Sequence, residues 1–329
     1  MPWTDDVVRV RVPATSANLG PGFDALGLAL SLHDDVDAWV CESGLSIEIS
    51  GESADLAGAG EDHLVVRAMR AAFAVTGGQP PGIGLRCVNR IPHGRGLGSS
   101  AAAIVAGILV AWALADPGPL AADGTGPRPA DALLGLATEL EGHPDNVAAR
   151  LGGGLTIAWT ADGQPRMVRL EPLSSIRPVV CVAPAPVRTE IARRLLPDLV
   201  PHQDAAANAG RSALLVAALT QLPAGPPETS GVLLAATRDW LHQDYRAAAM
   251  PETGALVGRL REAGIPAVVS GAGPSVLALL SGQKKSDCRH HLDSLGSIVR
   301  ETGIAWHISS LDVERRGARI LRPGSQLGY

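Results

Sequence analysis

Three glycines in one short segment form the strongest chemical signal in the chain. Gly94, Gly96 and Gly98 alternate with other residues in PHGRGLGSSAA, directly before a long apolar run. Glycines leave the backbone open to a ligand, and the first N–H groups of a helix carry a partial positive charge that suits phosphate. Ser99 and Ser100 add hydroxyls for a phosphate or for a metal ion bound to it. A tight turn that only caps a core helix is the alternative, but the complete GLGSSAA string favours a phosphate-binding loop.

Two further segments combine turn-forming glycines with polar side chains. VPATSANLGPGFDALG begins at Val12 and places Asn18 and Asp24 in a polar turn. SGAGPS at 270–275 forms a second backbone-exposing turn between two apolar runs. Each segment alone would be an ordinary loop.

These segments resemble the motifs of the GHMP small-molecule kinases, the family of galactokinase, homoserine kinase, mevalonate kinase and phosphomevalonate kinase. PHGRGLGSSAA is similar to the family's phosphate loop, and SGAGPS is similar to its third motif. VPATSANLGPGFDALGLAL resembles the first motif of the homoserine kinase branch, and EGHPDN at 141–146 and LHQDYR at 241–246 resemble further signatures of that branch. Residues 311–318 also resemble the corresponding segment of the family, and all these motifs follow one another in the same order as in the family.

The resemblance implies an ATP:L-homoserine O-phosphotransferase. Such an enzyme uses ATP and Mg²⁺ to phosphorylate the side-chain hydroxyl of L-homoserine, which gives O-phospho-L-homoserine in threonine biosynthesis. It also implies a two-lobed α+β fold with nucleotide and substrate in the cleft between the lobes. The expected N-terminal lobe contains a left-handed βαβ crossover, whereas most such crossovers are right-handed, and the expected C-terminal lobe is also α+β. The residues expected to bind ATP are Pro92, His93, Gly94, Arg95, Gly96, Leu97, Gly98, Ser99, Ser100, Ala101 and Ala102.

The same resemblance implies which residues hold homoserine. Asn18 and Asp24 match the family's substrate-binding asparagine and aspartate, with Asp24 suited to the ammonium group and Asn18 to the hydroxyl or amino group. Thr189 and Arg193 match a T-x-x-x-R pattern whose spacing puts both side chains on one helix face, and Arg246 matches a second carboxylate-binding arginine. A planar guanidinium pairs a carboxylate through two hydrogen bonds. The residues expected to act in catalysis are Asn18, Asp24, Asn146 and Arg193.

Three positions around this site stay open. His143 in EGHPDN matches a histidine near the family's substrate, with a structural role as the equal alternative. The proton acceptor is Asp145, Asn146 or neither, because phosphoryl transfer can proceed by positioning and charge stabilisation. His63 stands where the family has an asparagine near the adenine, so the adenine contacts are not assigned.

Magnesium needs hard oxygen ligands, which the family takes from a phosphate-loop serine and a nearby glutamate. Ser99 is the expected hydroxyl ligand, with Ser100 as its neighbour. Glu139 and Glu141 both flank the apolar stripe of one predicted helix, at similar angles. Glu141 is preferred because it opens EGHPDN, and Gly142 after it ends the helix and places the carboxylate at the rim of a loop.

Two other functions compete with this interpretation. A related kinase that acts on another amino acid or alcohol, such as L-threonine, would share the phosphate loop. The first motif, Arg193 and Arg246 favour an α-amino acid with a short hydroxylated side chain. A catalytically silent sensor of nucleotide and metabolite would be expected to lose metal or phosphate-loop residues, whereas Ser99, Glu141 and the full GLGSS are present.

The elements that must position these residues alternate between short apolar runs and helical patterns. The patterns predict two lobes, 1–165 with the ATP phosphate loop and 166–329. Strands are predicted at 7–12, 37–40, 45–49, 85–89, 155–159, 167–170, 179–183, 268–270 and 276–280. Helices are predicted at 64–75 with Asp62 as N-cap, at 99–115, 131–140, 208–220 and 233–242, and from about 189. The segments 116–129 and 223–230 are predicted loops.

Composition excludes several other classes of protein. The net charge of the 329 residues is −5, so no basic excess favours a nucleic-acid partner. Lys284 and Lys285 are the only lysines, and neither follows a glycine loop, which argues against a Walker-type nucleotide site. Four scattered cysteines predict free thiols in a reducing compartment, and the apolar run at 101–115 is too short for a membrane span. We therefore expect a cytoplasmic protein with a small-molecule substrate and no membrane partner, and a homodimer stays open.

Overall fold

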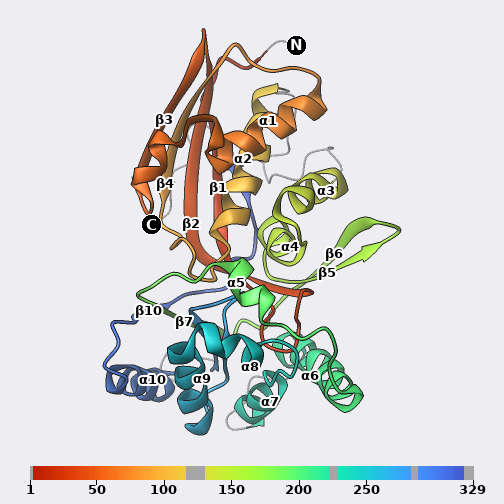
Figure 1. The fold of residues 1–329 in the computed structure, drawn as a ribbon, viewed down its shortest axis with the longest axis vertical. Helices are drawn as coiled ribbons and strands as arrows, with labels where there is room; N and C mark the ends of the chain where they lie inside the picture. Colours follow the sequence, from red (N-terminus) through yellow and green to blue (C-terminus); the bar gives the residue numbers. More distant parts are fainter. Residues whose placement is uncertain (1–2, 116–129, 222–227, 283–287, 322–329) are drawn as a thin grey trace.

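The computed structural model describes residues 3–115, 130–221, 228–282 and 288–321, and it places them in two lobes stacked end to end (Figure 1). The predicted loop at 116–129, most of the one at 223–230, and both lysines lie outside these ranges. Each lobe is built on one β-sheet.

The first sheet is mixed and, within the described ranges, has seven strands. These are β1 (Val8–Ala17), β2 (Leu26–Cys41), β3 (Gly44–Gly51), β4 (Gly82–Asn89), β5 (Leu155–Ala161), β6 (Gln164–Leu170) and β11 (Arg319–Leu321). Five follow the order β11-β1-β2-β4-β3, while β5 pairs with the start of β2 and with β6. β3 and β4 run parallel and are joined through the 3-10 segment η1 (Ala54–Asp62) and helix α1 (Leu64–Thr76), which makes this connection a βαβ crossover.

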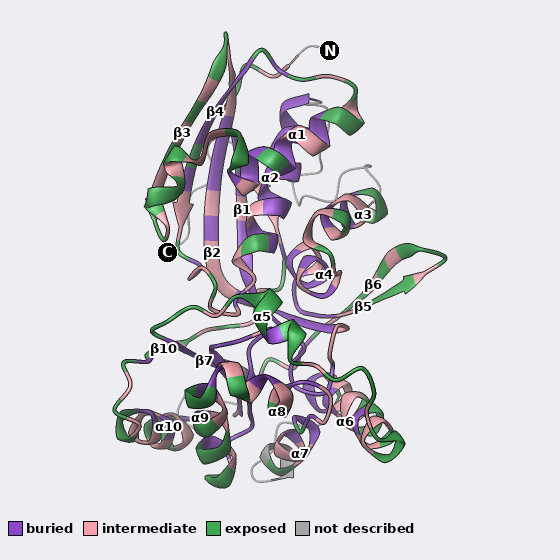
Figure 2. Ribbon diagram, in the orientation of Figure 1, coloured by how far each residue is buried: buried purple, intermediate pink, exposed green. Residues whose placement is uncertain are grey.

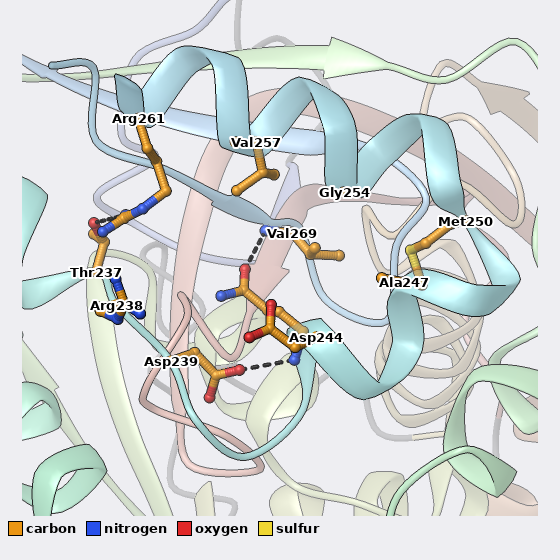
Figure 3. Close-up of a pocket in the computed structure, with 12 residues that line it drawn as sticks. Thr237, Arg238, Asp239, Asp244, Ala247, Met250, Gly254, Val257, Arg261 and Val269 are labelled. Atoms are coloured by element: carbon orange, nitrogen blue, oxygen red, sulfur yellow. Dashed lines mark hydrogen bonds between the residues drawn. The ribbon is translucent and has the colours of Figure 1, made fainter. Parts of the chain in front are cut away.

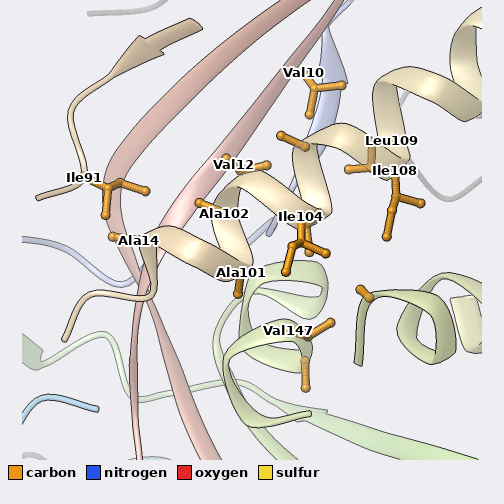
Figure 4. Packing of buried hydrophobic residues seen from close by; sticks show 14 of the residues in the cluster. Val10, Val12, Ala14, Ile91, Ala101, Ala102, Ile104, Ile108, Leu109 and Val147 are labelled. Carbon is orange, nitrogen blue, oxygen red and sulfur yellow. The ribbon is translucent and has the colours of Figure 1, made fainter. Parts of the chain in front are cut away.

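Four helices cover one face of this sheet: α1, α2 (Ser99–Ala115), α3 (Ala130–Glu141) and α4 (Asp145–Gly152) (Figure 1). α2 is apolar on all sides and is buried along most of its length, as expected of a helix enclosed by other elements (Figure 2). Ile104 and Ile108 of α2 belong to the same core as Val10 and Val12 of β1 (Figure 4). Gly107 lets α1 come close, because a Cβ there would lie 2.5 Å from the carbonyl oxygen of Val65.

The second sheet is antiparallel, in the order β10-β7-β9-β8. Its strands are β7 (Ile176–Val182), β8 (Ala267–Val269), β9 (Val276–Ser281) and β10 (His307–Ser310). The helices of this lobe are α5 (Thr189–Arg194), α6 (His202–Thr220), α7 (Glu228–Ala236), α8 (Gln243–Arg246) with the short η2 (Ala247–Ala249), α9 (Pro251–Glu262) and α10 (Arg289–Glu301). Side chains alternate across the sheet: Val180 and Leu277 join the main core, while Val179 and Val276 join a separate core with α9 and α10.

Several predicted elements are confirmed, among them the helix at α2, the hairpin of β8 and β9, and the helix that begins at Thr189. The division at residue 165 stays a prediction, and the first sheet continues to Leu170 and takes back β11 from the end of the chain. No helix in the described part of the chain is both long and apolar enough to cross a bilayer.

Three sequence predictions are wrong. The helix expected at 233–242 ends at Ala236, because the Asp239 carboxylate accepts the N–H groups of three residues after it and forms a turn. The loop expected at 223–230 is already helical at Glu228. Asp62 is not the N-cap of α1, since His63 occupies that position without a side-chain hydrogen bond.

Candidate active site

The glycine loop lies between β4 and α2, and its backbone has the geometry that the sequence requires. Gly94, Gly96 and Gly98 have φ angles of 65°, 73° and 71°, in the left-handed region that favours glycine. A Cβ at Gly96 would lie 2.2 Å from the carbonyl oxygen of Ser270, so no side chain fits there. The loop therefore leads directly into the N-terminus of α2, where free N–H groups can bind phosphate.

The third motif packs against the glycine loop and the first motif together. The Ser270 hydroxyl donates to the carbonyl of Gly96 at 2.7 Å, and it lies 2.9 Å from the hydroxyl of Ser16. The Gly271 N–H donates to the carbonyl of Ala17 at 3.1 Å. Hydrogen bonds between residues as far as 254 positions apart thus hold together the three segments that the sequence singled out.

Asn18 and Asp24 shape the turn between β1 and β2, with left-handed φ angles of 67° and 53°. The Asn18 side chain is only 4% exposed, and its Nδ2 donates to the carbonyl of Gly271 while its Oδ1 accepts the N–H of Asp24. Asn18 therefore holds the turn that presents Asp24, in addition to any contact with a ligand.

Asp24 faces Arg193 across the two lobes. The guanidinium of Arg193 on α5 donates to both carboxylate oxygens of Asp24, at 2.8 and 3.2 Å. Thr189 lies four residues earlier on the same helix and is exposed. The predicted binder of an ammonium group and the predicted binder of a carboxylate are thus brought into direct contact.

Arg246 on α8 is the second predicted carboxylate binder, and it is 1% exposed. Its guanidinium lies 5.2 Å from the centre of the Phe23 ring, and its Nη1 lies 3.3 Å from Nδ1 of His242. Its Nε is buried with no hydrogen-bond partner in the described part of the chain. Burial lowers the pKa of Arg246, and the charge of Arg193 acts in the same direction, so two cations gather where a carboxylate is expected.

His242 fixes Arg246 in place and is a residue that the sequence analysis did not single out. Its ring stacks on Phe23 at 5.1 Å, and its Nε2 lies 2.9 Å from the carbonyl oxygen of Gly20. Burial lowers the pKa of His242, which leaves Nδ1 free to accept from Arg246 while Nε2 donates to Gly20. Its position in the LHQDYR motif is the sequence feature that could have identified it.

Glu141 ends α3 beside the first turn of α2, and Gly142 after it has a φ of 94°. The Ser100 hydroxyl donates to Glu141 Oε1 at 2.7 Å, so the structure pairs this carboxylate with Ser100, whereas the sequence favoured Ser99. Burial raises the pKa of Glu141, while the Ser100 hydroxyl and the charges of His143 and Arg150 act in the opposite direction. Glu139 is exposed. No group of three His, Cys, Asp or Glu side chains suited to a metal occurs within the described ranges.

The EGHPDN segment continues into α4 with three polar side chains. Nδ1 of His143 lies 3.3 Å from Oδ1 of Asp145, and this carboxylate raises the pKa of His143. Asp145 is 3% exposed and accepts the N–H of Asn146 at 2.6 Å. Oδ1 of Asn146 accepts the Thr15 hydroxyl at 2.8 Å, so Asn146 reaches the first motif.

Arg150, one turn after Asn146 on α4, is fully buried and was missed by the sequence analysis. It donates to the carbonyl oxygens of Pro13 and Gly98, both at 2.7 Å. Burial lowers its pKa to about 10, so it stays protonated at neutral pH. A lone arginine in a small-residue helix usually indicates a solvated surface charge, so its burial could not be predicted from the sequence.

Two further features flank the site. His63 is 7% exposed with a buried Nδ1 that has no partner in the described residues, and burial, with His93 nearby, lowers its pKa. A cavity of about 190 Å³ lies behind α8, lined by the side chains of Gln243, Asp244 and Arg261, among others (Figure 3). In this cavity Gln243 accepts the N–H of Val269 at 2.6 Å, which anchors α8 to the second sheet.

Comparison with known proteins agrees with this arrangement. Residues 63–154 match the model of the GHMP kinases N-terminal domain, and residues 219–297 match that of the GHMP kinases C-terminal domain. A homoserine kinase of Streptomyces coelicolor is 54% identical over 314 residues, covering 95% of this chain and 94% of its own length. One from Streptomyces avermitilis is 55% identical over the same length, with 95% of each chain covered.

A solved structure extends the comparison to the fold. The crystal structure of a homoserine kinase from Cytophaga hutchinsonii superposes with a TM-score of 0.78 at 24% identity, covering 98% of this chain and 99% of that one. The chain therefore belongs to the GHMP kinases and, within them, to the homoserine kinase family.

Proposed function

We propose that this chain transfers the γ-phosphoryl group of ATP to the side-chain hydroxyl of L-homoserine, which yields ADP and O-phospho-L-homoserine in threonine biosynthesis. The observation that carries the proposal is the ion pair of Asp24 with Arg193, with Arg246 packed on Phe23 directly before Asp24, while the segment before α5 is hydrogen-bonded to the glycine loop. One carboxylate and two guanidinium groups match the ammonium and carboxylate of a free α-amino acid.

The substrate is held by its two charges. Its ammonium group binds Asp24, and its carboxylate binds Arg193 and the unpartnered Nε side of Arg246. Homoserine therefore takes the place of the direct ion pair between Asp24 and Arg193. Thr189 and His143 border this position, and the side-chain hydroxyl extends toward Asn146 and the phosphate loop. Fixing both charges orients the hydroxyl for attack and lowers the entropy cost of reaching the transition state.

The phosphates of ATP bind within residues 92–102, at free backbone N–H groups of the glycine loop and of the first turn of α2. Glu141 and the hydroxyl of Ser100, with Ser99 as its neighbour, fit Mg²⁺, because they place hard oxygen ligands side by side at the phosphate loop. When bound, Mg²⁺ offsets the charge of the β- and γ-phosphates. No group here needs to be a strong base, because Asn146 can hold the hydroxyl by a hydrogen bond while the surrounding donors stabilise the transferred group.

A coupled assay of ADP release with L-homoserine and Mg-ATP tests this function. L-Threonine serves as the competing substrate, because it shares the two charged groups but carries its hydroxyl one carbon closer to them. A cytoplasmic location and a homodimer are further proposals, and size-exclusion chromatography with light scattering checks the second.

A further inference from the structure

Thr15 and Arg150 lie beneath the phosphate loop, and the reaction outlined above makes no use of either residue. Both side chains are fully buried. Thr15 belongs to β1 and Arg150 to α4, so they join two elements that are 135 residues apart. A buried arginine is costly unless its donors are satisfied, and here three of them bind oxygens of β1 and of the phosphate loop.

The hydrogen bonds of Thr15 have a defined direction. Nη2 of Arg150 lies 3.1 Å from the Thr15 hydroxyl, and because a guanidinium only donates, the hydroxyl oxygen accepts. The single hydroxyl proton is then available to Oδ1 of Asn146, 2.8 Å away. Arg150 thus sets the direction in which Thr15 donates.

The amide of Asn146 is oriented from its other side as well. Its Nδ2 lies 3.5 Å from Oδ1 of Asp145, a carboxylate that only accepts, so the nitrogen belongs on the Asp145 side and the oxygen on the Thr15 side. The Thr15 hydroxyl fills one of the two lone pairs of Oδ1, and Gly98 packs against the same oxygen, so the oxygen is held on the side of β1 and the phosphate loop. The amide nitrogen is then the end that remains for a ligand, and its N–H can bind the lone pair of a hydroxyl or a phosphate oxygen.

The same residues touch the phosphate loop. A Cβ at Gly98 would lie 2.5 Å from the Thr15 hydroxyl, 2.9 Å from Asn146 Oδ1 and 2.9 Å from Arg150 Nη2. Arg150 also donates to the carbonyl of Gly98, and the Thr15 N–H donates to that of Leu97. The position of the Asn146 amide is thereby tied to the position of the loop that holds the phosphates.

We propose that Thr15 and Arg150 are positioning residues for phosphoryl transfer: they turn the amide of Asn146 so that its N–H faces the reacting hydroxyl, and they fix it relative to the phosphate loop. The inference rests on the proposed function, because Asn146 acts there beside the homoserine hydroxyl. It assigns Asn146 the role of a hydrogen-bond donor.

Thr15→Val tests the proposal, because it keeps the shape of the side chain and removes the hydroxyl. We expect kcat to fall by about ten- to hundredfold while the KM values for ATP and homoserine change by less than about threefold, since misorientation affects the reacting geometry more than binding. Thr15→Ser keeps the hydroxyl and should restore most of kcat. Thr156→Val makes the same change at another fully buried threonine, on β5, and should leave kcat near the wild-type value.

Two outcomes would overturn the proposal: a folded Thr15→Val enzyme with a kcat within twofold of wild type, or a Thr15→Ser enzyme as impaired as Thr15→Val. Side-chain amide NMR of protein labelled with ¹⁵N-asparagine gives a readout without turnover. The Asn146 signal, identified by its loss in Asn146→Asp, should move in Thr15→Val and stay in Thr15→Ser. An unmoved signal in Thr15→Val contradicts the proposal, even if the wild-type protein fails to phosphorylate homoserine and the proposed function itself is wrong.

Discussion

At the scale of single residues, Asp24 and Arg193 form an ion pair in the structure, and we expect a zwitterionic substrate to replace it. The side chains of Asp24 and Arg193 are 37% and 40% exposed, so their direct ion pair contributes little to stability and can be exchanged for substrate groups. Arg246 differs from them, because it is buried and its Nε has no partner among the described residues. We therefore assign Arg246 the larger share of carboxylate binding.

Replacement of either arginine by lysine tests this assignment. Arg193→Lys and Arg246→Lys keep the charge but lose the planar pair of donors, so we expect the KM for homoserine to rise about ten- to hundredfold, the equivalent of one charge-assisted hydrogen bond. The KM for ATP, measured on the same preparations, should change little and reports whether the site is still folded. An unchanged KM for homoserine in either variant would remove that arginine from the site.

The two glutamates near the end of α3 give a matched pair for the metal. Glu141→Gln removes the charge that lies against Ser100, and we expect it to lower kcat by at least about a hundredfold and to raise the Mg²⁺ concentration needed for half-maximal activity. Glu139→Gln, on the exposed face, should be much milder. Magnesium titrations of both variants test which glutamate binds the metal. An inactive Glu139→Gln enzyme together with an active Glu141→Gln enzyme would refute the assignment of Glu141.

At the scale of elements, the sequence predicts correctly the helices and strands whose hydrophobic pattern and end signals lie within one short segment. Ser99–Ala115 is apolar throughout and begins after a glycine turn, so both its burial and its start could be predicted. β2 was predicted only from residue 37, although it begins at Leu26. Residues 26–30 are all buried and therefore lack the alternation that marks a half-buried strand.

In the candidate site, too, only the residues that lie in short local motifs could be predicted from the sequence. Asn18, Asp24 and Glu141 could be found because they sit in short motifs with recognisable neighbours. Thr15 and Arg150 could not, because their role arises from hydrogen bonds across more than 130 residues. The end of α7 was missed for a related reason, since Asp239 forms a turn that helical periodicity does not reveal.

The segment that leads to β11 gives a pH-dependent test at this scale. Burial opposes ionisation of Glu314, but His33 at 2.6 Å and the N–H of Arg316 outweigh it and lower the pKa of Glu314 to about 2. A carboxylate whose pKa is depressed in the folded state stabilises the protein above its unfolded pKa of about 4.5, and this contribution disappears as the pH falls from 4.5 to 2.

We therefore expect Glu314→Gln to be less stable than wild type at pH 6, with the difference in the free energy of unfolding smaller by roughly 1–2 kcal/mol at pH 3. Urea denaturation at the two pH values measures this difference. Glu262→Gln, on an exposed position of α9, should show the wild-type pH dependence. A difference between Glu314→Gln and wild type that is constant with pH would contradict the depressed pKa.

At the scale of the whole molecule, the two lobes are joined by the same segments that build the site. The first motif comes from the N-terminal lobe, whereas Arg193, Arg246 and Ser270 come from the C-terminal one. The last described strand, β11, then returns to pair with β1. The proposed homoserine site therefore links substrate binding to the arrangement of the lobes, because it draws residues from both.

The central claim is that this junction of the lobes recognises homoserine. Its most direct test is ADP release from the full-length chain with Mg-ATP and, in parallel, L-homoserine, L-threonine, L-serine or mevalonate at millimolar concentration. We predict the highest kcat/KM for L-homoserine and no turnover of mevalonate, which lacks the ammonium group proposed to bind Asp24. Folded protein that releases no ADP in response to homoserine, or that prefers one of the other three compounds, would contradict the account.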